Sequence, residues 1–176
     1  MMPPPLKSWV CLLFLLSACN RRESTLRSIP ALNGDIVQAF ELSDSLRHHD
    51  WLIVDTRTQT EYVAGHIPGA VNLDWSRVTP RDAVTPFSLL PSDSLKNLFC
   101  ANGVVPQRRL VLYSHGDPEN PEYWGSEGLF YWIFRFYRFD SIRVLNGGFK
   151  AWLGAGGPVN SGEAMAVELE SCNWTM

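Results

Sequence analysis

Short apolar runs and segments with helical periodicity alternate along most of the chain. Residues 51–55 form a continuous apolar run, which is typical of a parallel strand covered on both faces. Three further runs, residues 70–74, 110–113 and 142–145, are predicted to be the other main strands. Their spacing leaves room for a helix between successive strands.

Helical periodicity predicts the connecting elements. Ser92 is the expected N-cap of the second helix, and Gly103 is expected to end it. The predicted helices are residues 35–48, 93–102, 126–137 and 148–153. Strands that alternate with helices favour an α/β fold of three layers, in which helices flank a mainly parallel central sheet.

The N-terminal segment has the pattern of an export signal. Lys7 precedes an apolar run at residues 9–16, which is too short to span a bilayer. The sequence Leu16-Ser17-Ala18-Cys19 resembles the bacterial lipobox, in which the peptide is cut before the cysteine and the thiol receives a diacylglycerol. Residues 1–18 are therefore predicted to be a lipoprotein signal peptide, and residues 19–34 a polar tether. An ordinary secretory peptide remains the alternative.

This resemblance implies a lipid anchor at Cys19 in a bacterial cell envelope. Asn20, which follows the lipidated position, is not an aspartate, and by analogy this favours the outer membrane, facing the periplasm. The expected partners are the membrane, through the lipid, and an envelope protein.

Composition narrows the class of protein. With 176 residues, of which 45% are hydrophobic, the chain can bury a full core in one domain with extensions. The net charge of −3 argues against nucleic acid as a partner, because phosphate binding requires clustered Lys and Arg. The cysteines and histidines are not spaced along the sequence as the ligands of a zinc ion usually are. Neither a metal nor another cofactor is expected. Cys100 could form a disulfide with Cys172. The favoured interpretation is that Cys100 is unpaired and packs as a small buried hydrophobic residue.

Three blocks in order resemble a rhodanese-like sulfurtransferase domain. The first, residues 54–70, contains Val-Asp-Thr-Arg and Gly-His-Ile-Pro-Gly-Ala. The second, residues 90–104, is a typical connecting helix. The third, residues 144–152, holds a Gly-Gly turn and a tryptophan. The resemblance covers residues 35–158 and leaves residues 159–176 as a polar tail. It is closest to the non-catalytic N-terminal half of tandem-domain thiosulfate sulfurtransferases.

The motif residues are interpreted as architectural. Arg57 is expected to pair with Glu61 across a short helix, and Asp55 to accept turn donors. His66 is expected to bond to backbone in its turn, with the mouth of a site as the alternative. Three further motif residues are expected to be structural: Gly147, Gly148 and Trp152.

The decisive departure from the family is Ser114. The resemblance implies that this strand-end position carries the cysteine that becomes a persulfide, and a hydroxyl oxygen cannot hold sulfur in that way. The loop that follows adds prolines without N–H groups and carboxylates that repel anions, namely Pro118, Pro121, Asp117, Glu119 and Glu122. We therefore predict a binding or scaffolding module that lacks intrinsic sulfurtransferase activity.

Two alternatives remain open. The chain could work as a thiosulfate sulfurtransferase with a partner that supplies the catalytic cysteine. Ser114, His115 and Asp117 could instead form a hydrolase set, although residues so close in sequence rarely share a proton path. The aromatic helix at residues 126–137 is expected to be mostly core, with part of it left for a partner surface.

Overall fold

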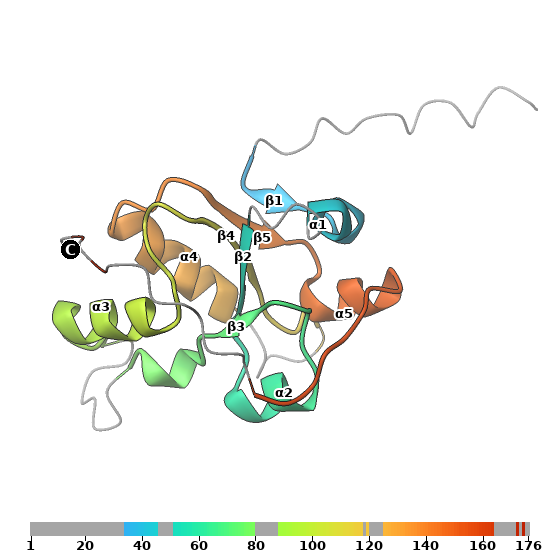
Figure 1. The fold of residues 1–176 in the computed structure, drawn as a ribbon, viewed down its shortest axis with the longest axis horizontal. Helices are drawn as coiled ribbons and strands as arrows, with labels where there is room; N and C mark the ends of the chain where they lie inside the picture. Colours follow the sequence, from blue (N-terminus) through green and yellow to red (C-terminus); the bar gives the residue numbers. More distant parts are fainter. Residues whose placement is uncertain are drawn as a thin grey trace, which may run out of the picture. The chain divides into compact units, whose positions relative to one another are not determined.

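The computed structural model describes the folded part of the chain, shown in Figure 1. The described residues are 34–45, 51–79, 88–117, 119, 125–163, 172 and 174. The predicted signal peptide and the predicted lipidation site, Cys19, lie outside this range. Within the described part, none of the helices has the length and hydrophobicity that crossing a bilayer requires.

Five strands form one sheet in which every pairing is parallel. The order across the sheet is β1-β5-β4-β2-β3. The strands are β1 (Ile36–Val37), β2 (Trp51–Asp55), β3 (Val71–Asn72), β4 (Arg109–Tyr113) and β5 (Ile142–Leu145). The predicted α/β class and its parallel sheet are confirmed.

Helices cover both faces of this sheet (Figure 1). Helices α3 (Ser92–Ala101) and α4 (Ser126–Phe136) enclose one buried cluster that contains Phe99 and Phe134. The second cluster, which contains Leu42, Tyr62 and Trp152, lies under α1, α2 and α5. Those helices span Ala39–Ser45, Gln59–Ala64 and Gly148–Gly154, and a short 3₁₀ helix spans Trp75–Arg77. The arrangement is the predicted three-layer fold.

The structure corrects the predicted ends of two helices. Residues 35–48 were expected to be one helix, but Ile36 pairs with Val144 at the edge of the sheet and the helix begins at Ala39. A two-residue edge strand is defined by its partner, so local periodicity does not reveal it. Ser92 is the first residue of α3 rather than its cap, since Pro91 occupies the N-cap position and no side chain caps this end.

The C-terminal residues that the structure describes belong to the packed domain. Cys172 forms a disulfide with Cys100, with 5.9 Å between their Cα atoms, so Cys100 is not the unpaired hydrophobe that was favoured. Trp174 is buried, and its ring meets that of Phe139 edge to face, with 5.5 Å between centroids. These contacts join residues far apart in sequence, which is why composition alone suggested a polar tail.

Candidate functional site

The direction in which successive strands are added to the sheet reverses between β2 and β4. The chain passes from β2 to β3 on one side, and β4 then returns to the other side of β2. In open α/β sheets, sites form outside the carboxyl ends of the strands at such a switch point. Thr56 and Ser114 directly follow the two strands, and the register places Asp55 opposite Tyr113. The switch point therefore lies at the residue that the sequence singled out, Ser114.

Helix α4 begins beside this switch point. The hydroxyl of Thr56 donates to the Tyr113 carbonyl oxygen at 2.9 Å, and its oxygen lies 2.7 Å from the hydroxyl oxygen of Ser126. Ser126 is the first residue of α4. The end of β2 is thus joined through hydroxyl groups to the start of the helix that follows the loop.

The loop after β4 is bonded to the first turn of α5. Ser114 is 2% exposed, and its carbonyl oxygen accepts the N–H of Phe149 at 2.8 Å. The carbonyl oxygen of His115 accepts the N–H of Lys150 at 2.9 Å. Two amide donors at the positive end of α5 are therefore directed at loop carbonyls.

Close backbone contact requires glycine in this loop. Gly116 has φ of 72°, and a Cβ there would lie 1.8 Å from the carbonyl oxygen of Gly147. A Cβ at Gly148 would lie 2.5 Å from the carbonyl oxygen of Ser114. The Gly-Gly turn is thus in direct contact with the loop, which gives the two motif glycines a structural role.

Two ion pairs tie the loop side chains to neighbouring helices. His115 Nε2 pairs with Glu61 Oε1 of α2, and Lys150 Nζ of α5 lies 3.2 Å from Asp117 Oδ1. Glu61 also completes a capping box with Thr58 at the start of α2. Burial raises the pKa of Glu61, but the hydrogen bonds from Thr58 and His115 outweigh burial and hold that pKa below its usual value.

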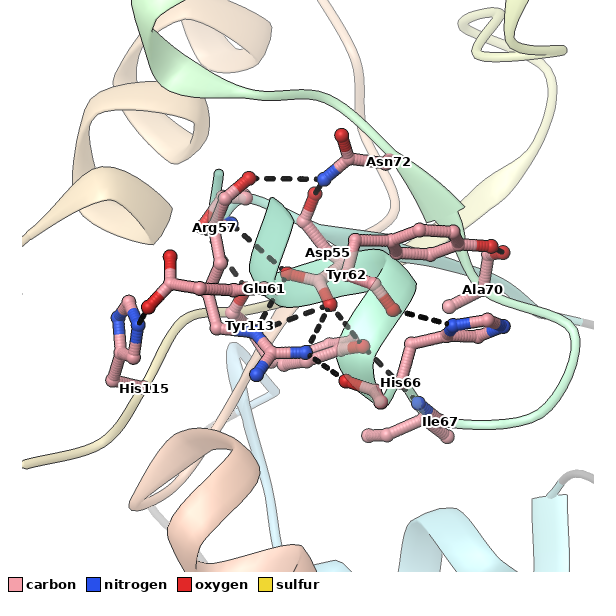
Figure 2. A network of polar contacts seen from close by, with 12 residues as sticks. Asp55, Arg57, Glu61, Tyr62, His66, Ile67, Ala70, Asn72, Tyr113 and His115 are labelled. Atoms are coloured by element: carbon pink, nitrogen blue, oxygen red, sulfur yellow. Dashed lines mark hydrogen bonds and ion pairs between the residues drawn. The ribbon is translucent and has the colours of Figure 1, made fainter. Parts of the chain in front are cut away.

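Arg57 pairs with Asp55 rather than with Glu61 (Figure 2). Arg57 Nη2 lies 2.6 Å from Asp55 Oδ2, and Nε lies 3.0 Å from Oδ1. Nη2 also donates to the Gly65 carbonyl oxygen at 2.7 Å, and the guanidinium lies 4.0 Å from the ring centroid of Phe149. The backbone N–H of Arg57 donates to the same carboxylate, so the turn after β2 selects Asp55 as the partner.

Opposing effects act on the pKa of Arg57. Burial lowers it, but hydrogen bonding and the charge of Asp55 together raise it above its ordinary value. The pair is almost fully buried, with relative exposures of 5% for Arg57 and 0% for Asp55. It is therefore inside the domain and is not presented to a ligand.

Tyrosine hydroxyls extend this network. Tyr113 donates to Asp55 Oδ2 at 2.5 Å and accepts the N–H of Ile67 at 3.2 Å (Figure 2). Burial and the charge of Asp55 raise the pKa of Tyr113 far above its ordinary value. Tyr62 donates to the Ala70 carbonyl oxygen at 2.6 Å, and burial with the Asp55 charge raises its pKa to about 12. Both tyrosines stay protonated and act as hydrogen-bond donors.

The remaining motif residues have structural environments. His66 is buried, its Nδ1 lies 2.8 Å from the Tyr62 carbonyl oxygen, and its ring stacks on that of Tyr62 at 3.8 Å. The structure thus places His66 against backbone rather than at a site mouth. Trp152 is fully buried and donates from Nε1 to the Pro158 carbonyl oxygen at 2.8 Å.

Several residues that shape this site were not singled out from the sequence. Thr56, Tyr113, Ser126 and Phe149 contribute through contacts between different elements. Tyr113 carried one local signal, a hydroxyl at the end of an otherwise apolar run. Of the loop residues expected to oppose anion binding, Asp117 and Glu119 are described. The others, Pro118, Pro121 and Glu122, lie outside the described residues.

The described residues contain no group of three or more His, Cys, Asp or Glu side chains arranged to hold a metal ion. Near the switch point, Asp55 is instead bonded to Arg57 and Tyr113, and Glu61 is paired with His115. Ser114 is buried among these groups, and its side chain offers a hydroxyl in place of a thiolate.

Comparison with curated proteins gives a consistent set of relatives. The chain is 32% identical to thiosulfate sulfurtransferase of Mus musculus over 136 residues, which are 73% of this chain and 43% of that protein. It is 29% identical over 119 residues to thiosulfate sulfurtransferase of Corynebacterium glutamicum, covering 67% of this chain and 37% of that protein. The chain therefore spans less than half the length of the curated relatives that it matches.

Solved structures agree on the fold. The 3-mercaptopyruvate sulfurtransferase SseA of Escherichia coli superposes with a TM-score of 0.63 at 21% identity, over 73% of this chain and 51% of that chain. YnjE superposes with a TM-score of 0.64 at 21% identity, over 77% of this chain and 33% of that chain. The rhodanese-like domain family model matches residues 38–155, within the predicted range of 35–158. This protein therefore belongs to the rhodanese-like domain family.

Proposed function

We propose that this protein is a membrane-tethered rhodanese-like module that lacks intrinsic sulfurtransferase activity and works by binding a partner. The observation that carries the proposal is Ser114, which directly follows β4 at the switch point of the sheet. Sulfur transfer through a persulfide needs a thiolate, and the ordinary cysteine pKa of about 8.5 makes one accessible near neutral pH. Serine has neither the acidity nor the capacity to carry sulfur in this way.

The backbone around Ser114 supports the same conclusion. An anion cradle requires N–H groups that converge on the ligand. Here the N–H groups of Phe149 and Lys150 donate to the carbonyl oxygens of Ser114 and His115. Asp117 of this loop carries a carboxylate whose charge is offset by Lys150 Nζ at 3.2 Å, so the proposal rests on Ser114 and on the bonded amides.

Assays for cyanide-dependent thiocyanate formation from thiosulfate test the proposal. We expect no turnover by the wild-type protein and little gain in Ser114→Cys, because the rest of the loop is unchanged. Ser114→Ala is the matched control, and circular dichroism checks that all three proteins fold. Robust turnover by the wild type would overturn the proposed inactivity, and substantial turnover by Ser114→Cys would show that the rest of the loop does not prevent sulfur transfer.

The tether rests on Cys19 and the lipobox-like sequence before it. We expect the full chain, expressed in a Gram-negative bacterium, to incorporate a fatty-acid label and to fractionate with the outer membrane. Cys19→Ser should abolish both. Labelling that persists in Cys19→Ser would refute the anchor at this position.

Two exposed aromatic rings on α4 support the binding role. Trp132 and Phe136 are 59% and 65% exposed and stack on each other at 5.7 Å. We expect the double variant Trp132→Ser/Phe136→Ser to lose a partner that chemical cross-linking captures in the native envelope. The control is Phe40→Ser, which removes an equally exposed ring from α1. Equal loss in both variants would show that the contact is not specific to α4.

A second function is favoured by the lengths of the relatives. The chain covers 43% of the mouse thiosulfate sulfurtransferase, so it resembles part of an enzyme. In this alternative, a separate protein supplies the catalytic cysteine. Adding a cysteine-bearing rhodanese domain should then raise turnover above that of the added domain alone, and unchanged turnover would count against the alternative.

A further inference from the structure

We propose that Cys100 and Cys172 form a reversible redox site that controls whether Trp174 covers Phe139. In the oxidised state the disulfide holds Trp174 against the cluster under α3 and α4. In the reduced state this covering is released while the rest of the domain remains folded. The inference does not depend on the function of the Ser114 loop.

The disulfide joins two elements that are distant in sequence. Cys100 lies in the last turn of α3, and Cys172 is 72 residues further along the chain. Their Cα atoms are 5.9 Å apart, within the usual range for a disulfide of about 4.4–6.8 Å. Both cysteines are half-buried, so neither is shut away from solvent in the core. A reductant can therefore approach the bond without unfolding the sheet.

The ring of Trp174 makes stabilising contacts, but its buried N–H group lacks a hydrogen-bond acceptor among the described residues. The ring packs edge to face against Phe139 at 5.5 Å, and the Lys96 ammonium lies 5.8 Å from it. Its Nε1 is buried and finds no acceptor within the described part of the chain. A buried donor without a partner is destabilising because it has given up its hydrogen bond to water. The packing of Trp174 against Phe139 is therefore only marginally stable without the disulfide.

The disulfide compensates for the missing hydrogen bond of Trp174. Because Cys172 is only two residues away, the cross-link keeps Trp174 at a high effective concentration next to Phe139. When the bond is broken, the same contact must be made by a segment with far more conformational freedom. Trp174 docking and the redox state of the two cysteines are thereby coupled.

Most of the described core residues lie outside the C-terminal region. Among the residues that the structure describes, sixteen buried ones form the cluster under α3 and α4, and of these Trp174 alone follows Ile142 in the sequence. The five strands that the structure describes lie within residues 36–145. Reduction is therefore expected to change the surface around Phe139 without removing the sheet or the second cluster.

The chemistry is a two-electron exchange with a dithiol. A thiolate of the reductant attacks one sulfur of the Cys100–Cys172 bond and forms a mixed disulfide, with the other cysteine as leaving group. The second thiol of the reductant then displaces the first cysteine and becomes oxidised. The protein gains two electrons and two protons, and the reductant becomes a disulfide.

The test uses the full chain in a Cys11→Ser/Cys19→Ser background, so that only two thiols can titrate. The protein is equilibrated with mixtures of reduced and oxidised dithiothreitol, and free thiols are trapped by alkylation and counted by mass spectrometry. Hydrogen exchange is followed in peptides that cover α3 and Phe139. Cys172→Ser mimics the reduced state, and Trp174→Ala uncovers Phe139 with the disulfide intact.

We expect reduction under native conditions to give two alkylated thiols and to accelerate exchange at least tenfold near Phe139, with exchange in β2 and β4 unchanged. Cys172→Ser and Trp174→Ala should reproduce the faster exchange, and dithiothreitol should have no effect on Cys172→Ser. Three results would overturn the proposal: resistance of the bond to native reduction, loss of protection throughout the sheet, or reduction without any change near Phe139.

Discussion

Tyr113 donates its hydroxyl proton to Asp55 across the two central strands, at 2.5 Å. The two residues are opposite each other in the parallel register of β2 and β4. Asp55 also holds the buried guanidinium of Arg57, so a single carboxylate connects both strands with the turn after β2. The charged groups at the switch point therefore hold the two central strands and the turn together.

Removing the Tyr113 hydroxyl should destabilise the domain more than removing that of Tyr62. Tyr113 donates to a charged carboxylate, whereas Tyr62 donates to a neutral carbonyl oxygen. We expect Tyr113→Phe to lower the free energy of unfolding by about 1.5–3 kcal/mol and Tyr62→Phe by about 0.5–1.5 kcal/mol. Urea denaturation at neutral pH measures both. An equal cost in the two variants would show that the charge on Asp55 adds nothing.

Substitution of Gly116 should test the contact between the loop and the Gly-Gly turn. An added Cβ would lie 1.8 Å from the Gly147 carbonyl oxygen, at a φ of 72°. We expect Gly116→Ala to cost at least about 2 kcal/mol, because left-handed backbone alone costs a side chain about 1–2 kcal/mol. Gly128→Ala is the matched control, since a Cβ there meets open space within α4. We expect the control to raise the midpoint of thermal unfolding slightly. Similar effects of the two substitutions on that midpoint would contradict the close contact.

The hydrogen bonds of Glu61 with Thr58 and with His115 predict a pH dependence at acid pH. The folded-state pKa of Glu61 lies below its ordinary value of 4.5, so its contribution to stability is present above that value and is lost as pH falls through the folded-state pKa. We therefore expect the stability difference between wild type and Glu61→Gln to be largest near neutral pH and to shrink below pH 4.5. Urea unfolding of both proteins across this range measures the difference. A difference that grows on acidification would refute the assignment.

The hydroxyl contact between Thr56 and Ser126 predicts coupling between the end of β2 and the start of α4. Their oxygens are 2.7 Å apart, so each single substitution already removes the contact. In a double-mutant cycle with Thr56→Val and Ser126→Ala, we expect a coupling energy of about 0.5–1.5 kcal/mol. The control cycle pairs Thr56→Val with Ser76→Ala, a serine of the 3₁₀ helix. Additivity in the first cycle would show that this contact does not stabilise the helix start.

The sequence-based predictions were most accurate where short-range pattern decides the structure. The apolar run at residues 51–55 coincides with β2, and the helix predicted at 126–137 differs from α4 only at its last residue. Predictions that depended on a distant partner were less accurate. Glu61 was expected to pair with Arg57 across the short helix, but its partner is His115, which the loop after β4 brings from 54 residues away. Arg57 pairs with Asp55 instead.

The sequence by itself determined the α/β class, the order of the elements and the presence of an oxygen where this family is expected to use sulfur. These properties follow from the periodicity of apolar side chains and from the chemistry of one atom. Only the tertiary structure decided the carboxylate that Arg57 shares with Tyr113, the docking of the Ser114 loop on α5 and the pairing of Cys100 with Cys172. Such contacts depend on strand register and on packing between distant segments, which no local pattern specifies.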